Sequence, residues 1–196
     1  SMPSDSDVAQ VLYDLISERK FVKDCQLFIR PHFGYNNDIE KFSEFLGKPG
    51  VVIDHYNNPS KGFSDHWDYS KEHMNHFLNT LRHTDVVLST ASTICLDAAA
   101  LGLPHILLAF DGQSKKPFYA DIERWYECNY FQEFIRFKSD LIARDYKSLI
   151  ESINTLLLEP KLLEKNQSQV CERFCHRVDG KSGERLFNVL KDICAE

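Results

Sequence analysis

Residues 85–112 read DVVLSTASTICLDAAALGLPHILLAFDG. The apolar run at 85–88 predicts a buried strand, and residues 94–101, which precede Gly102, predict an apolar helix. Residues 105–110 (HILLAF) predict a second buried strand. Almost continuously apolar strands that alternate with helices are typical of a parallel sheet covered by helices on both faces.

The same alternation continues on both sides of this segment. Further strands are predicted at 25–29 and 51–53, with a short one near 140–143. Ser70 is predicted to cap a helix, and residues 54–68 are predicted to form a loop. The other predicted helices span 6–19, 38–46, 146–158, 160–174 and 184–193. We therefore expect one α/β, Rossmann-like domain over 1–196, with a mainly parallel sheet flanked by helices on both faces.

The composition is that of an ordinary globular domain. Of the 196 residues, 43% are hydrophobic and 27% are charged, so we do not expect disorder. The formal net charge of -6 argues against general nucleic-acid binding, which needs a basic surface. A local basic pocket for one or two phosphates remains compatible with that total.

The six cysteines match no disulfide framework or zinc signature. Cys171, Cys175 and His176 lie close in sequence, as do His73 and His76, but neither group has the further ligands of a metal site. We predict reduced thiols, no metal and no cofactor. No signal peptide or membrane-spanning run is evident, so we expect a cytoplasmic location. Because Ser1-Met2 has the form of a cleaved tag before a chosen start, we expect the chain to come from a longer two-domain protein.

Ligands of open parallel sheets bind outside the carboxyl ends of the strands. Four polar segments follow the predicted strands: residues 30–32 (Arg-Pro-His), 54–55 (Asp-His), 89–93 (Ser-Thr-Ala-Ser-Thr) and 111–112 (Asp-Gly). We expect a binding site among them.

The turn at 89–93 is the most informative of these segments. It carries four hydroxyl side chains, those of Ser89, Thr90, Ser92 and Thr93. The start of the following helix offers unpaired N–H groups and the positive end of its dipole, which attract phosphate. Asp97 lies about one turn further, where a carboxylate could accept hydrogen bonds from ribose hydroxyls. Simple helix capping is the alternative for each hydroxyl. No GxGxxG motif supports a dinucleotide site.

Residues 85–112 resemble the C-terminal domain of GT-B glycosyltransferases and of CDP-glycerol glycerophosphotransferases. These families commonly show a strand, a Ser/Thr-rich turn, an acidic residue in the next helix, a small-Gly-x-Pro segment and another strand. FIRPHF (28–33) resembles their first-strand end RPHP, with Phe33 in place of the second proline. VDGKSGERL (178–186) resembles the DGKAxER stretch before their final helix. The resemblance covers roughly residues 25–190, and its central segment is the specific part.

The resemblance implies a donor-binding domain. The four hydroxyl side chains of the turn would hold the phosphates, and Asp97 would bind ribose, although the family more often has Glu there. Arg30 and His32 are the candidate catalytic residues, because they could stabilise the charge of the leaving group. Asp111 and Gly112 are further nucleotide-binding candidates. Lys181 and Arg185 would either add positive charge or lie on the surface.

The implied activity is transfer of a glycosyl or glycerophosphoryl group from a nucleotide-activated donor in surface polysaccharide or glycan synthesis. The partner would be an N-terminal acceptor domain, with peripheral association of the full-length protein at the inner face of the membrane. We expect the isolated domain to be inactive. Two alternatives stay open: half of a nucleotide-sugar epimerase, and a non-catalytic scaffold domain. In the second, Trp125-Tyr126 and Tyr130-Phe131 form either a protein interface or part of the core.

Overall fold

The computed structural model describes residues 5–32, 40–54, 70–112 and 116–195. Phe33, His55, the first two residues of the predicted helix at 38–46 and almost all of the predicted loop at 54–68 lie outside the described residues.

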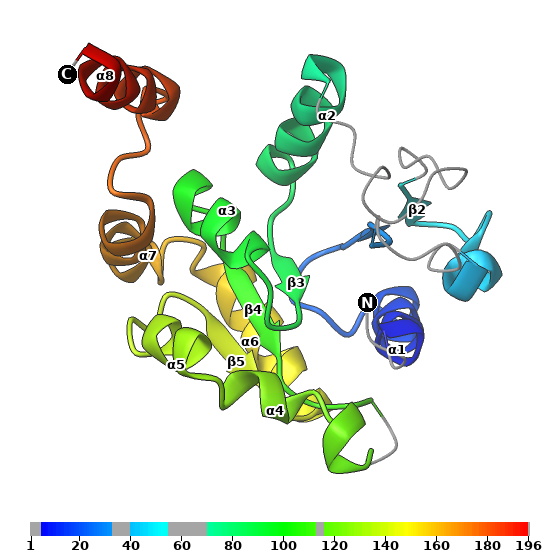
Figure 1. Ribbon diagram of the computed structural model, residues 1–196. Coiled ribbons are helices and arrows are strands. Elements are labelled where there is room, and N and C mark those ends of the chain that lie inside the picture. The colour runs from blue at the N-terminus through cyan, green and yellow to red at the C-terminus, as the bar shows by residue number, and fades with distance from the viewer. Residues whose placement is uncertain (1–4, 33–39, 55–69, 113–115, 196) are drawn as a thin grey trace.

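The described strands pair in parallel, as predicted, in two small sheets (Figure 1). One sheet joins β1 (Leu27–Ile29) to β2 (Val51–Ile53), with Ile29 opposite Ile53. The other has the order β3-β4-β5, and Ser89 lies opposite Leu107 in it. The strands of this second sheet are β3 (Val87–Ser89), β4 (His105–Leu108) and β5 (Leu141–Ala143). The fold is therefore α/β and compatible with a Rossmann-like arrangement, but each sheet is small.

The main helices lie close to their predicted positions, except for two short helices between residues 123 and 135 for which no bounds were predicted. They are α1 (Asp5–Ser17), α2 (Lys71–Arg82), α3 (Ile94–Leu101), α4 (Glu123–Tyr126), α5 (Asn129–Ile135), α6 (Tyr146–Leu158), α7 (Glu164–Val170) and α8 (Ser182–Ala195). Ser70 caps α2 by accepting a hydrogen bond from the backbone N–H of His73, as predicted. Asp145 and Ser148 form a capping box at the start of α6.

Several predicted boundaries were wrong. The described part of the helix predicted at 38–46 is the 3-10 helix η1 (Glu40–Phe45), in which Phe42 and Phe45 turn to the core. Their three-residue spacing suits three residues per turn. The helix predicted at 160–174 begins at Glu164 and passes into a π-helical turn, η4 (Cys171–Cys175). A second 3-10 helix, η3, spans Phe118–Ala120. The predicted strand at 105–110 ends at Leu108.

The two faces of β4 enter two different cores, which explains why the whole strand is apolar. Ile106 and Leu108 pack with side chains of α1 and α6. Leu107 and the following Ala109 pack with side chains of α3, α5 and α7. The predicted cover of helices on both faces is therefore confirmed for the three-stranded sheet. Leu27 of β1 contacts both the first core and a separate cluster around β2, so it connects the packing of the two sheets.

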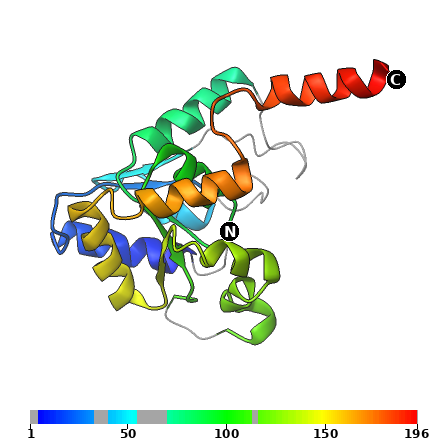
Figure 2. The same cartoon turned by 90° about the vertical axis from the view of Figure 1, so that its left-hand side faces the viewer.

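The C-terminal helix α8 lies apart from both sheets and projects beyond α7 (Figures 1 and 2). Its apolar side chains are exposed; they are Leu186, Phe187, Val189, Leu190 and Ile193. Within the described ranges, no helix is both long and apolar enough to cross a membrane.

Candidate functional site

Parallel pairing brings the segments that follow β1 and β2 to the same edge of their sheet. Arg30 follows β1 and Asp54 follows β2, and their Nη1 and Oδ2 atoms lie 3.0 Å apart. His76 of α2 reaches the same carboxylate, with its Nε2 3.1 Å from Asp54 Oδ1. The guanidinium of Arg30 also lies over the ring of Phe77, 4.9 Å from its centroid. Three elements thus contribute to one charged cluster, of which the sequence analysis predicted Arg30 and Asp54 but not His76.

This cluster is largely shielded from water. The side chain of Asp54 is 5% exposed and that of Arg30 is 19% exposed. Burial lowers the pKa of the Arg30 guanidinium, and the attraction of Asp54 opposes that effect. Arg30 already forms an ion pair with Asp54. A diphosphate that binds Arg30 must therefore compete with the Asp54 carboxylate for the positive charge of the guanidinium. His32, the other candidate catalytic residue, is exposed two residues further along the chain.

The turn at 89–93 follows β3, and buried side chains fix its inner side. The Oγ of Ser89 lies 2.9 Å from Nε2 of His105 and 2.8 Å from the backbone oxygen of Thr90. The Tyr126 hydroxyl donates to the backbone oxygen of Leu108 at 2.7 Å, and Ala91 packs against the buried cluster to which Tyr126 belongs.

The thiol of Cys95 lies beneath the same turn. Its Sγ donates to the backbone oxygen of Ser92, 2.8 Å away. Burial, with a further contribution from Asp140, raises the pKa of this thiol to about 12, so it stays protonated. Cys95 is therefore a hydrogen-bond donor to the turn and not a nucleophile.

The outer side of the turn carries the remaining hydroxyls. Ser92 and Thr93 are exposed, and Thr90 is half-buried. The side chain of Thr93 makes no capping hydrogen bond to α3, so the capping alternative does not describe it. Asp97 lies one turn into α3 and is exposed, although neighbouring protein atoms desolvate its carboxyl enough to raise its pKa. The structure therefore groups Thr90, Ser92, Thr93 and Asp97 around the start of α3.

Ser89 and Asp111 face the protein instead. Asp111 is only 8% exposed, and its Oδ2 accepts a hydrogen bond from the backbone N–H of Ile122, just before α4. Burial, and then the nearby Asp121, raise the pKa of its carboxyl. Gly112 follows with φ +68°, a conformation that favours glycine. These two residues shape the chain beyond β4.

One polar cluster was missed by sequence reasoning. Nδ1 of His105 lies 2.5 Å from Oδ1 of Asp140, whose Oδ2 accepts a hydrogen bond from the Ser139 hydroxyl at 2.6 Å. His105 is 0% exposed and Ser139 is 1% exposed. The sequence feature that could have revealed this cluster is a polar residue at the start of each of two apolar strands, His105 in β4 and Asp140 directly before β5.

Comparisons of this chain with protein-family models, curated proteins and solved structures found no match. The resemblance of residues 85–112 to GT-B domains therefore stays a prediction.

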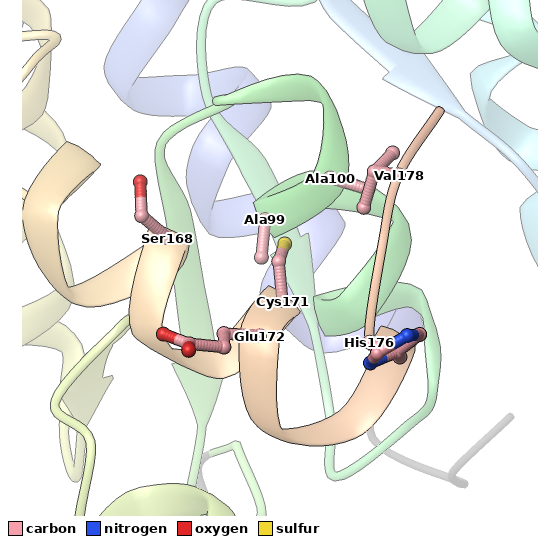
Figure 3. Close-up of a pocket in the computed structure, with 7 residues that line it drawn as sticks. All are labelled: Ala99, Ala100, Ser168, Cys171, Glu172, His176 and Val178. Atoms are coloured by element: carbon pink, nitrogen blue, oxygen red, sulfur yellow. The ribbon is translucent and has the colours of Figure 1, made fainter. Parts of the chain in front are cut away.

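A pocket of about 330 Å³ lies elsewhere, between α3 and the end of α7 (Figure 3). It contains none of the predicted site residues, and it is lined by Ala99, Ala100, Ser168, Cys171, Glu172, His176 and Val178. Cys171 points toward α3 in this view, and burial raises the pKa of its thiol, which disfavours the thiolate that a metal needs. His73, in the other sequence group considered for metal binding, is fully buried, whereas His76 contacts Asp54.

Lys181 directly precedes α8 and Arg185 lies in its first turn, and this helix lies apart from the three-stranded sheet (Figure 1). Arg185 pairs with Asp179 of the preceding loop. The structure therefore does not bring these two cations to the candidate site.

Proposed function

We propose that this chain is the donor nucleotide-binding half of a transferase that moves a glycosyl or glycerophosphoryl group. The observation that carries the proposal is the outer side of the turn at 89–93. There, the exposed hydroxyls of Ser92 and Thr93 stand at the start of α3 and directly after a parallel strand. Hydroxyl donors and the positive end of a helix dipole together favour a phosphate. The N–H groups of Cys95 and Leu96 already bond to the oxygens of Ser92 and Thr93, so the hydroxyls are the main donors.

The other predicted residues take roles that fit their surroundings. Asp97 accepts hydrogen bonds from ribose hydroxyls while the diphosphate rests at the start of α3. Arg30 and His32 stabilise the negative charge that the leaving nucleotide gains in the transition state. Asp54 and His76 hold the Arg30 guanidinium in place, since Asp54 contacts both. The acceptor, and with it the rest of the active site, comes from a partner domain.

The first experiment is a calorimetric panel of CDP, UDP, GDP, ADP and TDP, with the matching nucleosides. We expect one diphosphate to bind more tightly than the others and much more tightly than its own nucleoside. Folded protein that binds no diphosphate and no inorganic pyrophosphate would contradict the proposal.

Variants then locate the site. Thr93→Val should weaken binding of the preferred diphosphate about tenfold or more, because a hydrogen bond to a charged group contributes roughly 1.5–3 kcal/mol. Thr155→Val is the matched control, because Thr155 is exposed on α6 and its hydroxyl donates to the backbone oxygen of Glu151. Arg30→Ala should weaken diphosphate binding more than nucleoside binding. Equal losses for the two ligands would move Arg30 away from the phosphates.

A non-catalytic binding domain is the second candidate, and α8 is the observation that favours it. An exposed row of apolar side chains on a helix is typical of a protein-interaction surface. Diphosphate binding distinguishes the two candidates, because a scaffold domain does not need it.

A further inference from the structure

We propose that His105 and Asp140 are positioning residues, which hold Ser89 and the backbone of the turn at 89–93 in the shape that binds phosphate. The ligand in this inference rests on the proposed function. The positioning of the turn does not depend on the proposed function, because contacts inside the protein define it.

The contacts form a continuous chain from the core to the turn. Ser139 donates to Asp140, Asp140 contacts Nδ1 of His105, and Nε2 of His105 contacts the Oγ of Ser89 at 2.9 Å. The chain ends at the turn itself, since Ser89 Oγ also lies 2.8 Å from the backbone oxygen of Thr90. His105 is fully buried and the Asp140 side chain is 4% exposed, so water does not compete for these hydrogen bonds.

Two proton arrangements are compatible with the contacts of His105. In the first, Nδ1–H donates to the Asp140 carboxylate and the Ser89 hydroxyl donates to Nε2, so this hydroxyl has no second proton for the oxygen of Thr90. In the second, both ring nitrogens carry protons, Nε2–H donates to Ser89 Oγ, and the Ser89 hydroxyl donates to the oxygen of Thr90. In both arrangements the Oγ of Ser89 is directed to the imidazole. Ser89 therefore acts on a ligand through the turn, while the hydroxyls of Thr90, Ser92 and Thr93 remain for direct contact.

Two further buried groups act on the same short segment. Ala91 packs against the buried cluster that contains Tyr126 and Cys95, and the Cys95 thiol donates to the backbone oxygen of Ser92. Together with His105, this cluster contacts Ser89, Ala91 and Ser92 from the inner side, and the Ser89 hydroxyl contacts the backbone oxygen of Thr90. A backbone fixed in this way loses less conformational entropy when an anion binds, which is the benefit of a preorganised site.

Ser89, His105 and Asp140 also contact one another in the order of a serine-hydrolase triad. Burial argues against that role here. A triad histidine must pass a proton to the leaving group, but His105 is 0% exposed and has no surface that a substrate could reach. These contacts therefore position the turn and do not activate Ser89 as a nucleophile.

The test uses Asp140→Asn, which keeps the size of the side chain but removes the carboxylate. We expect affinity for pyrophosphate and for the preferred nucleoside diphosphate to fall at least tenfold, with nucleoside affinity unchanged. Asp145→Ala is the matched control, because it removes the cap of α6 and lowers Tm without touching the turn. Ser89→Ala serves as a second variant if Asp140→Asn fails to fold, since it removes only one hydroxyl.

A ligand-free readout separates the two proposals. In wild-type protein, long-range ¹H–¹⁵N NMR should show a proton on Nδ1 of His105, and Asp140→Asn should redistribute the ring protons and shift the backbone amides of residues 90–93. Unchanged amide shifts together with unchanged pyrophosphate affinity would overturn the positioning role. Wild-type protein that binds no pyrophosphate would overturn the proposed function, and the amide shifts would still decide the position of the turn. Covalent labelling of Ser89 by a fluorophosphonate would overturn the assignment in favour of a nucleophile.

Discussion

Arg30 Nη1 lies 3.0 Å from Asp54 Oδ2, and this ion pair joins the carboxyl ends of β1 and β2. The parallel register causes the pairing, since Ile29 lies opposite Ile53 and the next residue of each strand leaves the sheet at the same edge. The backbone N–H of Asp54 also donates to the oxygen of Ile29 at 2.8 Å. The backbone of Asp54 is therefore fixed to β1, and its buried carboxylate is held by Arg30 and His76.

Arg30→Ala should lower the free energy of unfolding by about 3 kcal/mol, because removing one partner of a buried ion pair leaves the other charge uncompensated. Urea unfolding measures this change. Adding Asp54→Asn to Arg30→Ala should restore part of the loss, although the contact of Asp54 with His76 limits the recovery.

The control for this prediction is an exposed ion pair. Arg144 Nη1 lies 3.6 Å from Glu123 Oε1, and the two side chains are 61% and 55% exposed. Arg144→Ala should lower the free energy of unfolding by less than about 1 kcal/mol, since water and salt screen such pairs. Equal costs for Arg30→Ala and Arg144→Ala would show that the Arg30 pair is not buried in solution.

Asp97→Asn should weaken nucleotide binding without destabilising the fold at neutral pH, because Asp97 is exposed on α3 and its charged form is disfavoured there. Since the pKa of this carboxyl is raised, its charged form, to which we assign the proposed ribose contact, is lost at a higher pH than for an ordinary aspartate. Affinity should therefore fall as the pH is lowered through that raised pKa, and calorimetry at several pH values measures it.

The raised pKa of Asp97 also makes the free energy of unfolding depend on pH in a defined direction. A carboxyl that binds its proton more tightly in the folded state favours folding at low pH, and this contribution disappears as the pH rises from the ordinary to the raised pKa. Asp97→Asn should remove that pH dependence. If the variant and the wild type keep the same dependence of binding on pH, Asp97 is not the ribose contact.

Cys95 should resist alkylation in the folded protein. Its pKa of about 12, against an ordinary value of 9.0, lowers the thiolate fraction on the order of a thousandfold, and only the thiolate reacts. Mass spectrometry after iodoacetamide treatment should show Cys128 and Cys194 modified long before Cys95, because both are exposed. In urea the difference should vanish. Rapid labelling of Cys95 in native protein would mean that the inner side of the turn opens.

Gly102→Ala should destabilise the protein by about 1 kcal/mol. Gly102 ends α3 with φ +66°, where a side chain is strained, and no atom lies within 4 Å of the Cβ that alanine would add. The cost is therefore conformational and not steric. Gly183→Ala is the comparison, since Gly183 also has open space around it but lies within α8 without a positive φ. Urea unfolding should show no loss for Gly183→Ala, and a similar loss for both variants would contradict the explanation.

The local order of elements could be predicted from the sequence because apolar periodicity is a property of neighbouring residues. The apolar runs around Ile53, Leu88 and Leu107 predicted strands, and all three lie in parallel strands. Boundaries were less accurate where tertiary packing selects the helix type. The spacing of Phe42 and Phe45 suits both an α-helix and a 3-10 helix. In the structure this segment is a 3-10 helix, and both rings pack in the core around β2.

The hydroxyl side chains at 89–93 could be recognised in the sequence for the same local reason, since a turn and the helix start after it are contiguous. The buried residues that contact that turn could not be predicted from the sequence. His105 and Asp140 are 35 positions apart, and Ser89 and His105 are 16 apart, so only the pairing of β3, β4 and β5 brings their side chains into contact. Local pattern thus predicts which residues can present hydroxyls to a ligand. Long-range packing selects which of them turn outward and which, like Ser89, are held by the core.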